Sequence, residues 1–397
     1  MEFRFSPQEE AFRQEVVEFL KDELPPGFVG YETGDEYTGE AWELTKSFSK
    51  KLAAKGWLTL SWPREYGGQA RSYIEQLVYT EEMAYHGAPA AAMDMGVGGV
   101  SWVGPTLMLY GTEGQKKEHL PPIAAGERFW CTGYSEPGSG SDLASLQTCA
   151  VSDGDDYIVN GQKIWTSGGH VMDWYWLAVR TDTDAPKHKG ISILMVDMRS
   201  AGITIRPILN MAGGHGFNEI FLEDVRVPKR NRVGEENQGW YILAVSLDFE
   251  RSIINFVASA KRLLDRLIEY VKDTRWNGEV LSRKALIRHK MAEMATDVEL
   301  GRWLMYRVAW MLSRGKVANY EASISKLYST ELRQRIFNAS MQIAGLLGQL
   351  EGGSRWTPFQ GSLERGYLLS VADTIESGTS EVQRNIIATR GLGLPKQ

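Results

Sequence analysis

Two glycine- and serine-containing segments hold the residue types best suited to bind a polar cofactor. Residues 130–142 contain three serines and three glycines, and residues 160–169 follow, where an Asn-Gly pair precedes Trp165. Glycine has no Cβ, so neighbouring backbone N–H groups can approach a phosphate or the polar edge of a ring closely. We therefore expect a strand-rich platform that presents hydrogen-bond donors and one aromatic face to a flat cofactor.

The composition is that of a soluble protein with more than one domain. The 397 residues exceed a usual domain, and 43% hydrophobic with 24% charged residues permit a sizeable core. A net charge of −6 without a long basic run argues against nucleic-acid binding. We find no apolar stretch long enough for a membrane span and no signal-peptide pattern, so we expect a cytoplasmic protein.

Metal chemistry is not expected from this sequence. The two cysteines, Cys131 and Cys149, are too few for a disulfide framework or a cysteine metal site, and their scarcity fits a reducing compartment. The six histidines never fall at metal-ligand spacing.

The elements that must position these segments change type twice along the chain. Residues 1–126 read as a helical domain: Ser6, Pro7 and Glu9 form a capping-box pattern, and further helices are expected at 41–55, 72–84, 98–109 and 116–125. Pro121 and Pro122 should split the last of these into two short pieces.

Residues 127–238 read as an antiparallel β domain. The segment 157–165 has Asn-Gly in its middle, which predicts a hairpin with its tip there, and strands are expected at 174–179, 190–196, 203–208 and 219–228. Residues 239–397 return to long helices, at 240–272, 282–313, 320–347 and 384–390. The sequence thus predicts a multidomain α+β protein of three domains.

Six segments, taken in order, resemble the acyl-CoA dehydrogenase family over nearly the whole chain. They are residues 56–68, 110–117, 134–142, 160–167, 221–228 and 378–384. Each is weak alone, but their order and spacing make the resemblance specific. It implies an N-terminal helical domain, a middle β-barrel-like domain and a C-terminal four-helix bundle, in agreement with the pattern above.

The resemblance implies an oxidoreductase of lipid metabolism, as in fatty acid β-oxidation, with noncovalent FAD and a coenzyme A thioester. The reaction would be α,β-dehydrogenation to the trans-2-enoyl-CoA: a carboxylate takes the α-proton, and the β-hydrogen leaves as hydride to flavin N5. The thioester carbonyl must be polarised for the carboxylate to succeed, while the flavin receives the hydride. Electron-transferring flavoprotein would then accept the electrons.

The resemblance also assigns cofactor contacts position by position. Tyr134 and Ser135 would meet the flavin pyrimidine edge, and Gly140 and Ser141 the pyrophosphate, with Ser141 also touching the substrate. Trp165 would lie against the isoalloxazine, with Thr166 beside it and Ser167 bonding near N5. The remaining FAD contacts, partly to a neighbouring subunit, would be Arg275, Gln342, Gly345, Thr379 and Glu381.

Taken singly, these residues have plainer explanations. Gly138 and Gly140 could be turn glycines, Trp165 a core residue and Arg275 a solvated helix end. Residues 88–104, rich in alanine and glycine, would leave room for a bulky acyl group or would only let helices pack closely.

The catalytic base is open. Many family members carry a glutamate where this chain has Ser377, and Glu376 lies one residue earlier, which in an extended loop points to the other side. A minority place the base on a helix directly before an arginine, as in Glu250-Arg251. We therefore prefer Glu250 as base, with Glu376 as the alternative. The backbone N–H of Ser377 would polarise the thioester carbonyl, and Arg251 would support the base and substrate.

Two other functions stay open because of these departures. One is a silent subunit that binds FAD or CoA within a hetero-oligomer, and the other is a flavin oxidase of the same fold. The family pattern is also absent from two further segments, Arg275-Trp-Asn-Gly278 and the loop 210–218. The contact that one subunit makes to the FAD of its neighbour would therefore be rearranged. The assembly expected is a homotetramer or an α2β2 hetero-oligomer.

Overall fold

The computed structural model describes residues 4–28, 30, 35–249 and 254–395, which fall into two compact units. The sheet unit spans Gly34–Arg71 and Pro89–Arg251. The helical unit spans Met1–Thr33, Ser72–Ala88 and Ser252–Gln397. The helices of the N-terminal third are therefore shared between the two units.

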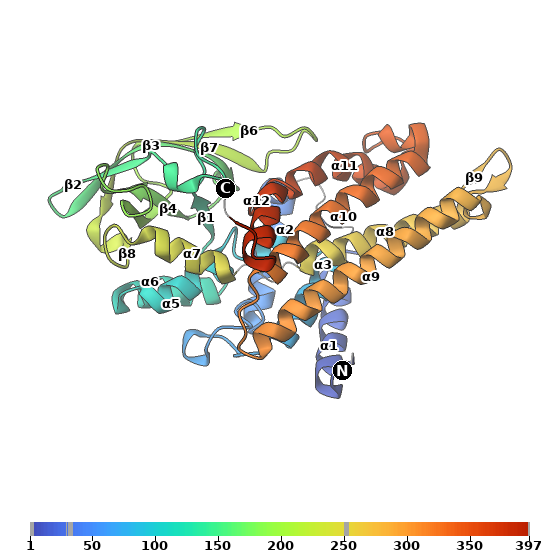
Figure 1. The fold of residues 1–397 in the computed structure, drawn as a ribbon, viewed down its shortest axis with the longest axis horizontal. Helices are drawn as coiled ribbons and strands as arrows, with labels where there is room; N and C mark the ends of the chain where they lie inside the picture. The colour runs from blue at the N-terminus through green and yellow to red at the C-terminus, as the bar shows by residue number, and fades with distance from the viewer. Residues whose placement is uncertain (1–3, 29, 31–34, 250–253, 396–397) are drawn as a thin grey trace. The chain divides into compact units, whose positions relative to one another are not determined.

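The sheet unit is built on an eight-stranded sheet with the order β6-β7-β3-β2-β4-β5-β8, while β1 pairs with β4 (Figure 1). Most neighbouring strands are antiparallel, as predicted, but β1 and β2 each run parallel to β4. The strands are β1 Trp130–Gly133, β2 Cys149–Asp153, β3 Asp156–Ser167, β4 Trp174–Arg180, β5 Ile191–Asp197, β6 Ile203–Ile208, β7 Phe217–Pro228 and β8 Arg232–Val233.

The predicted hairpin at Asn160-Gly161 is wrong. Both residues lie inside the continuous strand β3, where the register against β7 shifts between Val159 and Gly161. An added Cβ at Gly161 would come within 2.5 Å of Thr148 Oγ1, and Asn160 Nδ2 donates to Asp224 Oδ1 at 3.0 Å. The dipeptide thus forms a β-bulge packed against a neighbouring strand instead of a turn.

The expected Asn-Gly turn exists elsewhere in the chain. β9 (Arg275–Trp276) and β10 (Glu279–Val280) form a hairpin whose two-residue loop is Asn277-Gly278. Both loop residues have positive φ, 52° and 81°, as a tight hairpin turn of the mirror-image type requires. This hairpin was not predicted from the sequence.

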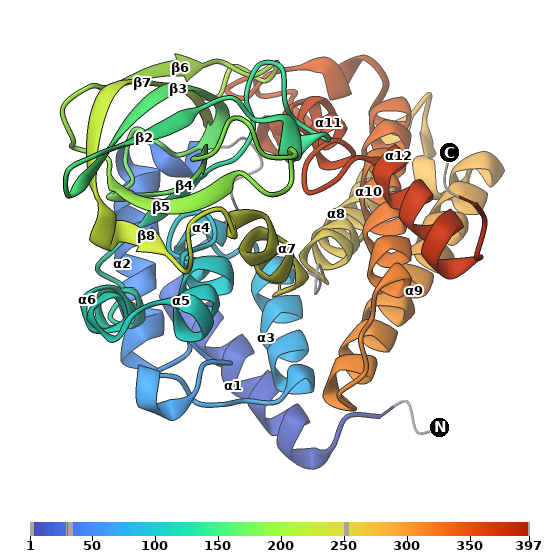
Figure 2. The ribbon, with the colours of Figure 1, turned by 60° about the vertical axis from the view of Figure 1, so that its left-hand side comes forward.

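Helices accompany the sheet in the same unit, and Figure 2 shows α5 and α6 side by side. They are α2 Gly39–Ala54, α4 Ala90–Met93, α5 Gly104–Tyr110, α6 Glu113–Ala124 and α7 Gly239–Phe249. A π-helical turn, Gly99–Val103, leads into α5.

The predicted split of α6 is wrong, because Pro121 and Pro122 both lie inside one helix. A proline cannot donate to the carbonyl four residues earlier, which for Pro122 belongs to Glu118. Arg128 Nη1 donates to that Glu118 oxygen at 2.8 Å instead. This side chain thus supplies a donor to one of the two carbonyls, those of Lys117 and Glu118, to which the prolines cannot donate.

The helical unit contains the long helices predicted for the C-terminal part, together with α1 and α3. The capping box of Ser6 and Glu9 is confirmed, with bonds of 2.7 and 3.2 Å in the two directions. The helices are α1 Pro7–Glu23, α3 Tyr73–His86, α8 Ile254–Asp273, α9 Ala285–Ser313, α10 Tyr320–Ala344, α11 Ser362–Asp373 and α12 Ser380–Ile386. α11 was not predicted, and α12 begins before the predicted 384.

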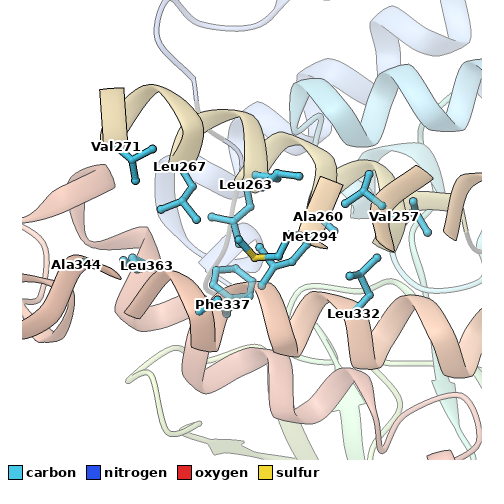
Figure 3. Close-up of a cluster of buried hydrophobic side chains, with 14 of the residues drawn as sticks. Val257, Ala260, Leu263, Leu267, Val271, Met294, Leu332, Phe337, Ala344 and Leu363 are labelled. Carbon is cyan, nitrogen blue, oxygen red and sulfur yellow. The ribbon is translucent and has the colours of Figure 1, made fainter. Parts of the chain in front are cut away.

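The core of the helical unit lies between α8, α9, α10 and α11 (Figure 3). Leu267 on α8 and Leu332 on α10 are fully buried, and Phe337 is nearly so. Gly366 on α11 allows this packing, since an added Cβ would lie 2.2 Å from the Phe337 ring. The four-helix bundle implied by the resemblance is thus present.

None of the helices in the described ranges combines the length and apolar character that crossing a bilayer would demand.

Candidate active site

A buried ion pair holds the glycine-containing loop between β1 and β2 in place. Lys163 Nζ on β3 lies 2.8 Å from Glu136 Oε1 and donates to the Tyr134 carbonyl at 3.1 Å. The backbone N–H groups of Gln147 and Thr148 also donate to the Glu136 carboxylate, at 2.6 and 2.9 Å. Each end of the loop is therefore held by a fixed charge.

Each member of this pair shifts the pKa of the other. Burial lowers the pKa of Lys163 to about 8, against the opposing attraction of Glu136. Burial alone would raise the pKa of Glu136, but the Lys163 charge and the hydrogen bonds from Lys163, Thr148 and Gln147 lower it overall. Each charge therefore favours the ionised form of the other.

The loop itself exposes its glycines. Glu136 and Ser139 exchange two backbone hydrogen bonds of 2.8 and 3.0 Å, which close a tight turn. A Cβ added to Gly138 or Gly140 would meet nothing within 4 Å, so packing within the chain does not require glycine at either position. Ser141 is exposed beside them. A pocket of about 410 Å³ borders this turn and includes Gly161 and Gln162 of β3.

The end of β3 presents an aromatic side chain next to this loop. Trp165 is 56% exposed, and its backbone is left-handed, with φ 63°. The register against β7 shifts between Lys163 and Thr166, so Trp165 lies in a bulge. The Ile164 N–H donates to the Ser135 carbonyl at 3.0 Å, which joins the strand end to the loop. The structure thus brings Tyr134, Ser135, Trp165, Thr166 and Ser167 together.

Thr166 and Ser167 differ in their surroundings. Thr166 is buried, with its hydroxyl 2.9 Å from the Tyr175 hydroxyl, and its carbonyl accepts from Asn218 Nδ2 at 3.0 Å. Ser167 is partly exposed and pairs with Phe217 of β7. Of the two, Ser167 is the one with surface open to solvent.

The helical unit holds the second group of predicted residues, in the loop between α11 and α12. Ser377 has φ 51° and is exposed, as is Glu376. Lys326, which is buried, donates to the Gly378 carbonyl at 3.0 Å and to the Asp373 carbonyl at 2.9 Å. The loop that carries Ser377 is therefore fixed by a buried ammonium group.

Thr379 and Glu381 follow directly. The Thr379 hydroxyl accepts from the Val382 N–H at 3.2 Å and caps α12. Glu381 lies in the first turn, where its own backbone N–H and the Thr379 hydroxyl lower its pKa. Both residues are thus already engaged in holding the helix start.

The remaining predicted residues of this unit are surface residues. Arg275 is exposed in the β9–β10 hairpin and donates to the Gly278 carbonyl at 3.2 Å. Gln342 and Gly345 are exposed at the end of α10, where Gly345 has φ 60° and open space around it. Within the unit, Arg275 lies in its own hairpin, whereas Thr379 and Glu381 adjoin Ser377.

Glu250 and Arg251 lie outside the described residues. The described chain ends α7 at Phe249 and resumes α8 at Ile254. The preferred base therefore stays a prediction.

Lys163, Glu136 and Lys326 support the predicted residues but were not identified from sequence. Lys163 could have been recognised from the sequence. It follows Tyr157 and Val159 of β3 at an even spacing, so its side chain is expected on the same buried face as theirs. A lysine at an inward position of a strand needs a buried partner. Lys326 gave no comparable signal within its helix.

The arrangement defines a class: a β platform with an exposed indole beside a glycine turn, combined in one chain with a four-helix bundle. The chain matches the N-terminal domain of acyl-CoA dehydrogenases over residues 6–127, the middle domain over 131–225 and the C-terminal domain over 237–392. It belongs to the acyl-CoA dehydrogenase family, whose members are FAD-dependent flavoprotein oxidoreductases.

Three similar proteins span the whole chain. Acyl-CoA dehydrogenase FadE26 of Mycobacterium tuberculosis is 36% identical over 406 residues, covering 100% of this chain and 99% of that protein. The ChsE4-ChsE5 complex from the same species contains a chain that is 36% identical, with a TM-score of 0.88 and full coverage of both chains. The Tcur3481-Tcur3483 steroid ACAD is 34% identical, again with a TM-score of 0.88 and full coverage of both.

Proposed function

We propose that this protein catalyses the FAD-dependent α,β-dehydrogenation of an acyl-CoA thioester to the trans-2-enoyl-CoA. The observation that carries the proposal is that three surface features of the sheet unit lie next to one another. There, the Ile164–Ser135 hydrogen bond links the exposed indole of Trp165 and the partly exposed Ser167 to the open glycine turn. An aromatic face flanked by polar donors suits a flat, partly polar ring.

The residues present fit FAD. Trp165 would cover one face of the ring system, Ser167 and Thr166 would lie near its reactive nitrogen, and Tyr134 and Ser135 would meet its polar edge. Gly138 and Gly140 have no neighbour that explains them within the chain, which suits close approach of a pyrophosphate to Gly140 and Ser141. When bound, FAD would supply the acceptor for a hydride from the substrate.

Arg275, Gln342, Gly345, Thr379 and Glu381 are proposed to contact FAD of the same or a neighbouring subunit. Arg275, Gln342 and Gly345 are exposed and available for such contacts, whereas Thr379 and Glu381 would have to make them while they also hold the start of α12.

The protein side of the reaction needs a base and a donor to the thioester carbonyl. We propose Glu250 as the base, with Glu376 as the alternative, since a family member with serine at position 377 must obtain its carboxylate elsewhere. The Ser377 N–H would stabilise the developing enolate, because a donor fixed in advance needs no reorganisation during the reaction. Lys326 supports this by holding the adjacent Gly378 carbonyl. Arg251 would support the base region and substrate.

For the substrate we propose a bulky, ring-containing acyl group, with electron-transferring flavoprotein as the acceptor. The match to a structure named as a steroid dehydrogenase supports the first part, together with the small residues 88–104. For the assembly we propose an α2β2 hetero-oligomer before a homotetramer, supported by the match to a two-component complex.

The test is anaerobic titration of the purified yellow protein with a panel of straight-chain, branched and steroid acyl-CoA thioesters, read by loss of flavin absorbance. Bleaching by at least one thioester is expected. Bound flavin without bleaching by any of them would favour the silent-subunit alternative. Rapid peroxide formation in air would favour an oxidase.

A further inference from the structure

Behind the Trp165–Ser167 edge, three side chains of the sheet unit form a continuous hydrogen-bonded chain that the proposed reaction leaves unused. Asn218 on β7 is fully buried, and its Nδ2 donates to the Thr166 carbonyl at 3.0 Å. The same Nδ2 lies 3.2 Å from His170 Nδ1, while Asn218 Oδ1 lies 2.9 Å from His215 Nε2. His170 Nε2 in turn lies 3.1 Å from the Tyr37 carbonyl.

The chemistry of the amide fixes which atom donates at each contact. A carbonyl only accepts, so Nδ2 must face Thr166, and its second hydrogen must point to His170. His170 Nδ1 is therefore the acceptor, and Nε2 carries the hydrogen that reaches Tyr37. His215 must donate through Nε2 to Asn218 Oδ1. Each of the two amide hydrogens and each acceptor named here is then used once, provided that His170 is neutral and in this tautomer.

A proton on His170 would break the arrangement. The new N–H at Nδ1 would face the Asn218 amino group, so the amide would have to turn over. Asn218 Oδ1 would then face the Thr166 carbonyl, and two acceptors would repel each other. Thr166 would lose the donor that holds the backbone next to Trp165.

The surroundings of His170 favour its neutral form. Burial lowers its pKa, and the nearby His215 lowers it further, although the Tyr37 and Asn218 contacts oppose this. The two imidazole rings are stacked with centroids 4.1 Å apart, so two positive charges would repel strongly. The titratable groups on the described elements around this chain include Glu36 and Tyr37 of η1 (Asp35–Tyr37), Tyr175 of β4 and Glu219 of β7.

Tyr175 and Glu36 stay protonated more readily than usual because burial raises the pKa of each. Glu219 accepts from Gln162 Nε2 at 3.0 Å.

We propose that Asn218 is a positioning residue: it holds the Thr166 carbonyl and so orients Trp165 and Ser167 toward the flavin, and a proton on His170 releases it. This inference rests on the proposed FAD site. It adds a proton-dependent support to the cofactor platform, formed by residues outside the proposed set of FAD contacts.

The experiment measures the FAD dissociation constant of the apoprotein and the flavin absorption spectrum at about pH 8 and about pH 5.5. Asn218→Asp keeps the shape of the side chain but lacks the donor to Thr166. Asn231→Asp is the matched control, since Asn231 Nδ2 donates to the Met195 carbonyl at 3.0 Å elsewhere in the same unit. His170→Gln keeps a donor for Tyr37 but does not titrate.

At the higher pH, we expect Asn218→Asp to weaken FAD binding about tenfold or more and to alter the flavin spectrum, and Asn231→Asp to do neither. Wild type should lose affinity as the pH falls below the ordinary histidine value of 6.5, and His170→Gln should not. If Asn218→Asp does not fold, His215→Leu at a half-buried position removes the partner of Oδ1 and should weaken binding about threefold at an unchanged melting temperature.

FAD binding equal to wild type in Asn218→Asp, or in His215→Leu where that variant replaces it, would overturn the inference. An unaltered pH dependence in His170→Gln would also overturn it. FAD binding by wild type would still stand in those cases. A wild-type protein that binds no FAD at either pH would overturn both this inference and the proposed function.

Discussion

The ammonium group of Lys163 lies 2.8 Å from Glu136 Oε1, and both side chains are buried beneath the glycine turn. Removing one partner leaves the other charge buried without its ion partner, which costs about 3–5 kcal/mol. We therefore expect Lys163→Met to lower the free energy of unfolding by that amount in urea denaturation. The double variant Lys163→Met/Glu136→Gln should recover part of the loss, and a single-variant loss below about 1 kcal/mol would contradict the pair's role.

The choice between two carboxylates is testable by a matched pair of substitutions. Glu250→Gln should abolish flavin bleaching by acyl-CoA while flavin stays bound, because the amide cannot take the α-proton. Glu376→Gln should leave bleaching within about threefold of wild type. Stopped-flow absorbance under anaerobic conditions measures both. Unchanged bleaching in Glu250→Gln would reject it as the base, and loss in Glu376→Gln alone would assign the role there.

His119 on α6 makes the sheet unit sensitive to acid. Burial, followed by the charge of Arg128, lowers its pKa from 6.5 to about 4, and its ring is packed edge-on against Trp130 and Trp174. The unfolded imidazole binds a proton near pH 6.5 while the folded one stays neutral. Stability therefore falls as the pH drops from there toward 4, by up to about 3 kcal/mol at 1.36 kcal/mol per unit.

We expect His119→Gln, which can still accept from Arg128, to lose less stability than wild type between about pH 7 and pH 5. Urea midpoints at the two values measure this. Equal losses in both proteins would show that other groups control the acid sensitivity.

Lys326 links α10 to the loop of Ser377. Lys326→Met would leave the Asp373 and Gly378 carbonyls without this donor, at a cost of about 1–3 kcal/mol for the buried contact to Asp373 and less for the part-buried one to Gly378. Because the proposed donor N–H belongs to the residue before Gly378, kcat should fall about tenfold or more with less change in FAD affinity. Steady-state kinetics at a temperature where circular dichroism shows a folded bundle would decide this. A normal kcat there would disconnect Lys326 from the reaction.

The two Asn-Gly pairs show that a local sequence pattern does not by itself determine the local structure. Asn160-Gly161 and Asn277-Gly278 carry the same local signal, yet only the second forms a turn. The first is decided by Thr148 and Asp224, residues of other segments whose contacts no local pattern contains. α6 is similar, because Arg128 lies beyond the helix that it completes.

For the candidate site too, local motifs were predicted and long-range contacts were not. The motif order placed Tyr134, Ser135 and Trp165 in segments that the structure joins through Ile164. The supporting contacts escaped prediction because they connect residues far apart in the chain, as Asn218 does with Thr166 and His170. Such contacts depend on strand pairing and register, which the sequence alone did not provide.

Trp165 has a backbone geometry suited to glycine, with φ 63°. A bulky residue there costs about 1–3 kcal/mol that the surrounding bulge must absorb. A laboratory selection for heat resistance, carried out on the empty protein, would therefore favour Trp165→Gly and discard the indole. Screens for more heat-stable variants should be run with cofactor present. The stability gained by removing the backbone strain at this residue then competes with the stability lost when the cofactor binds less tightly.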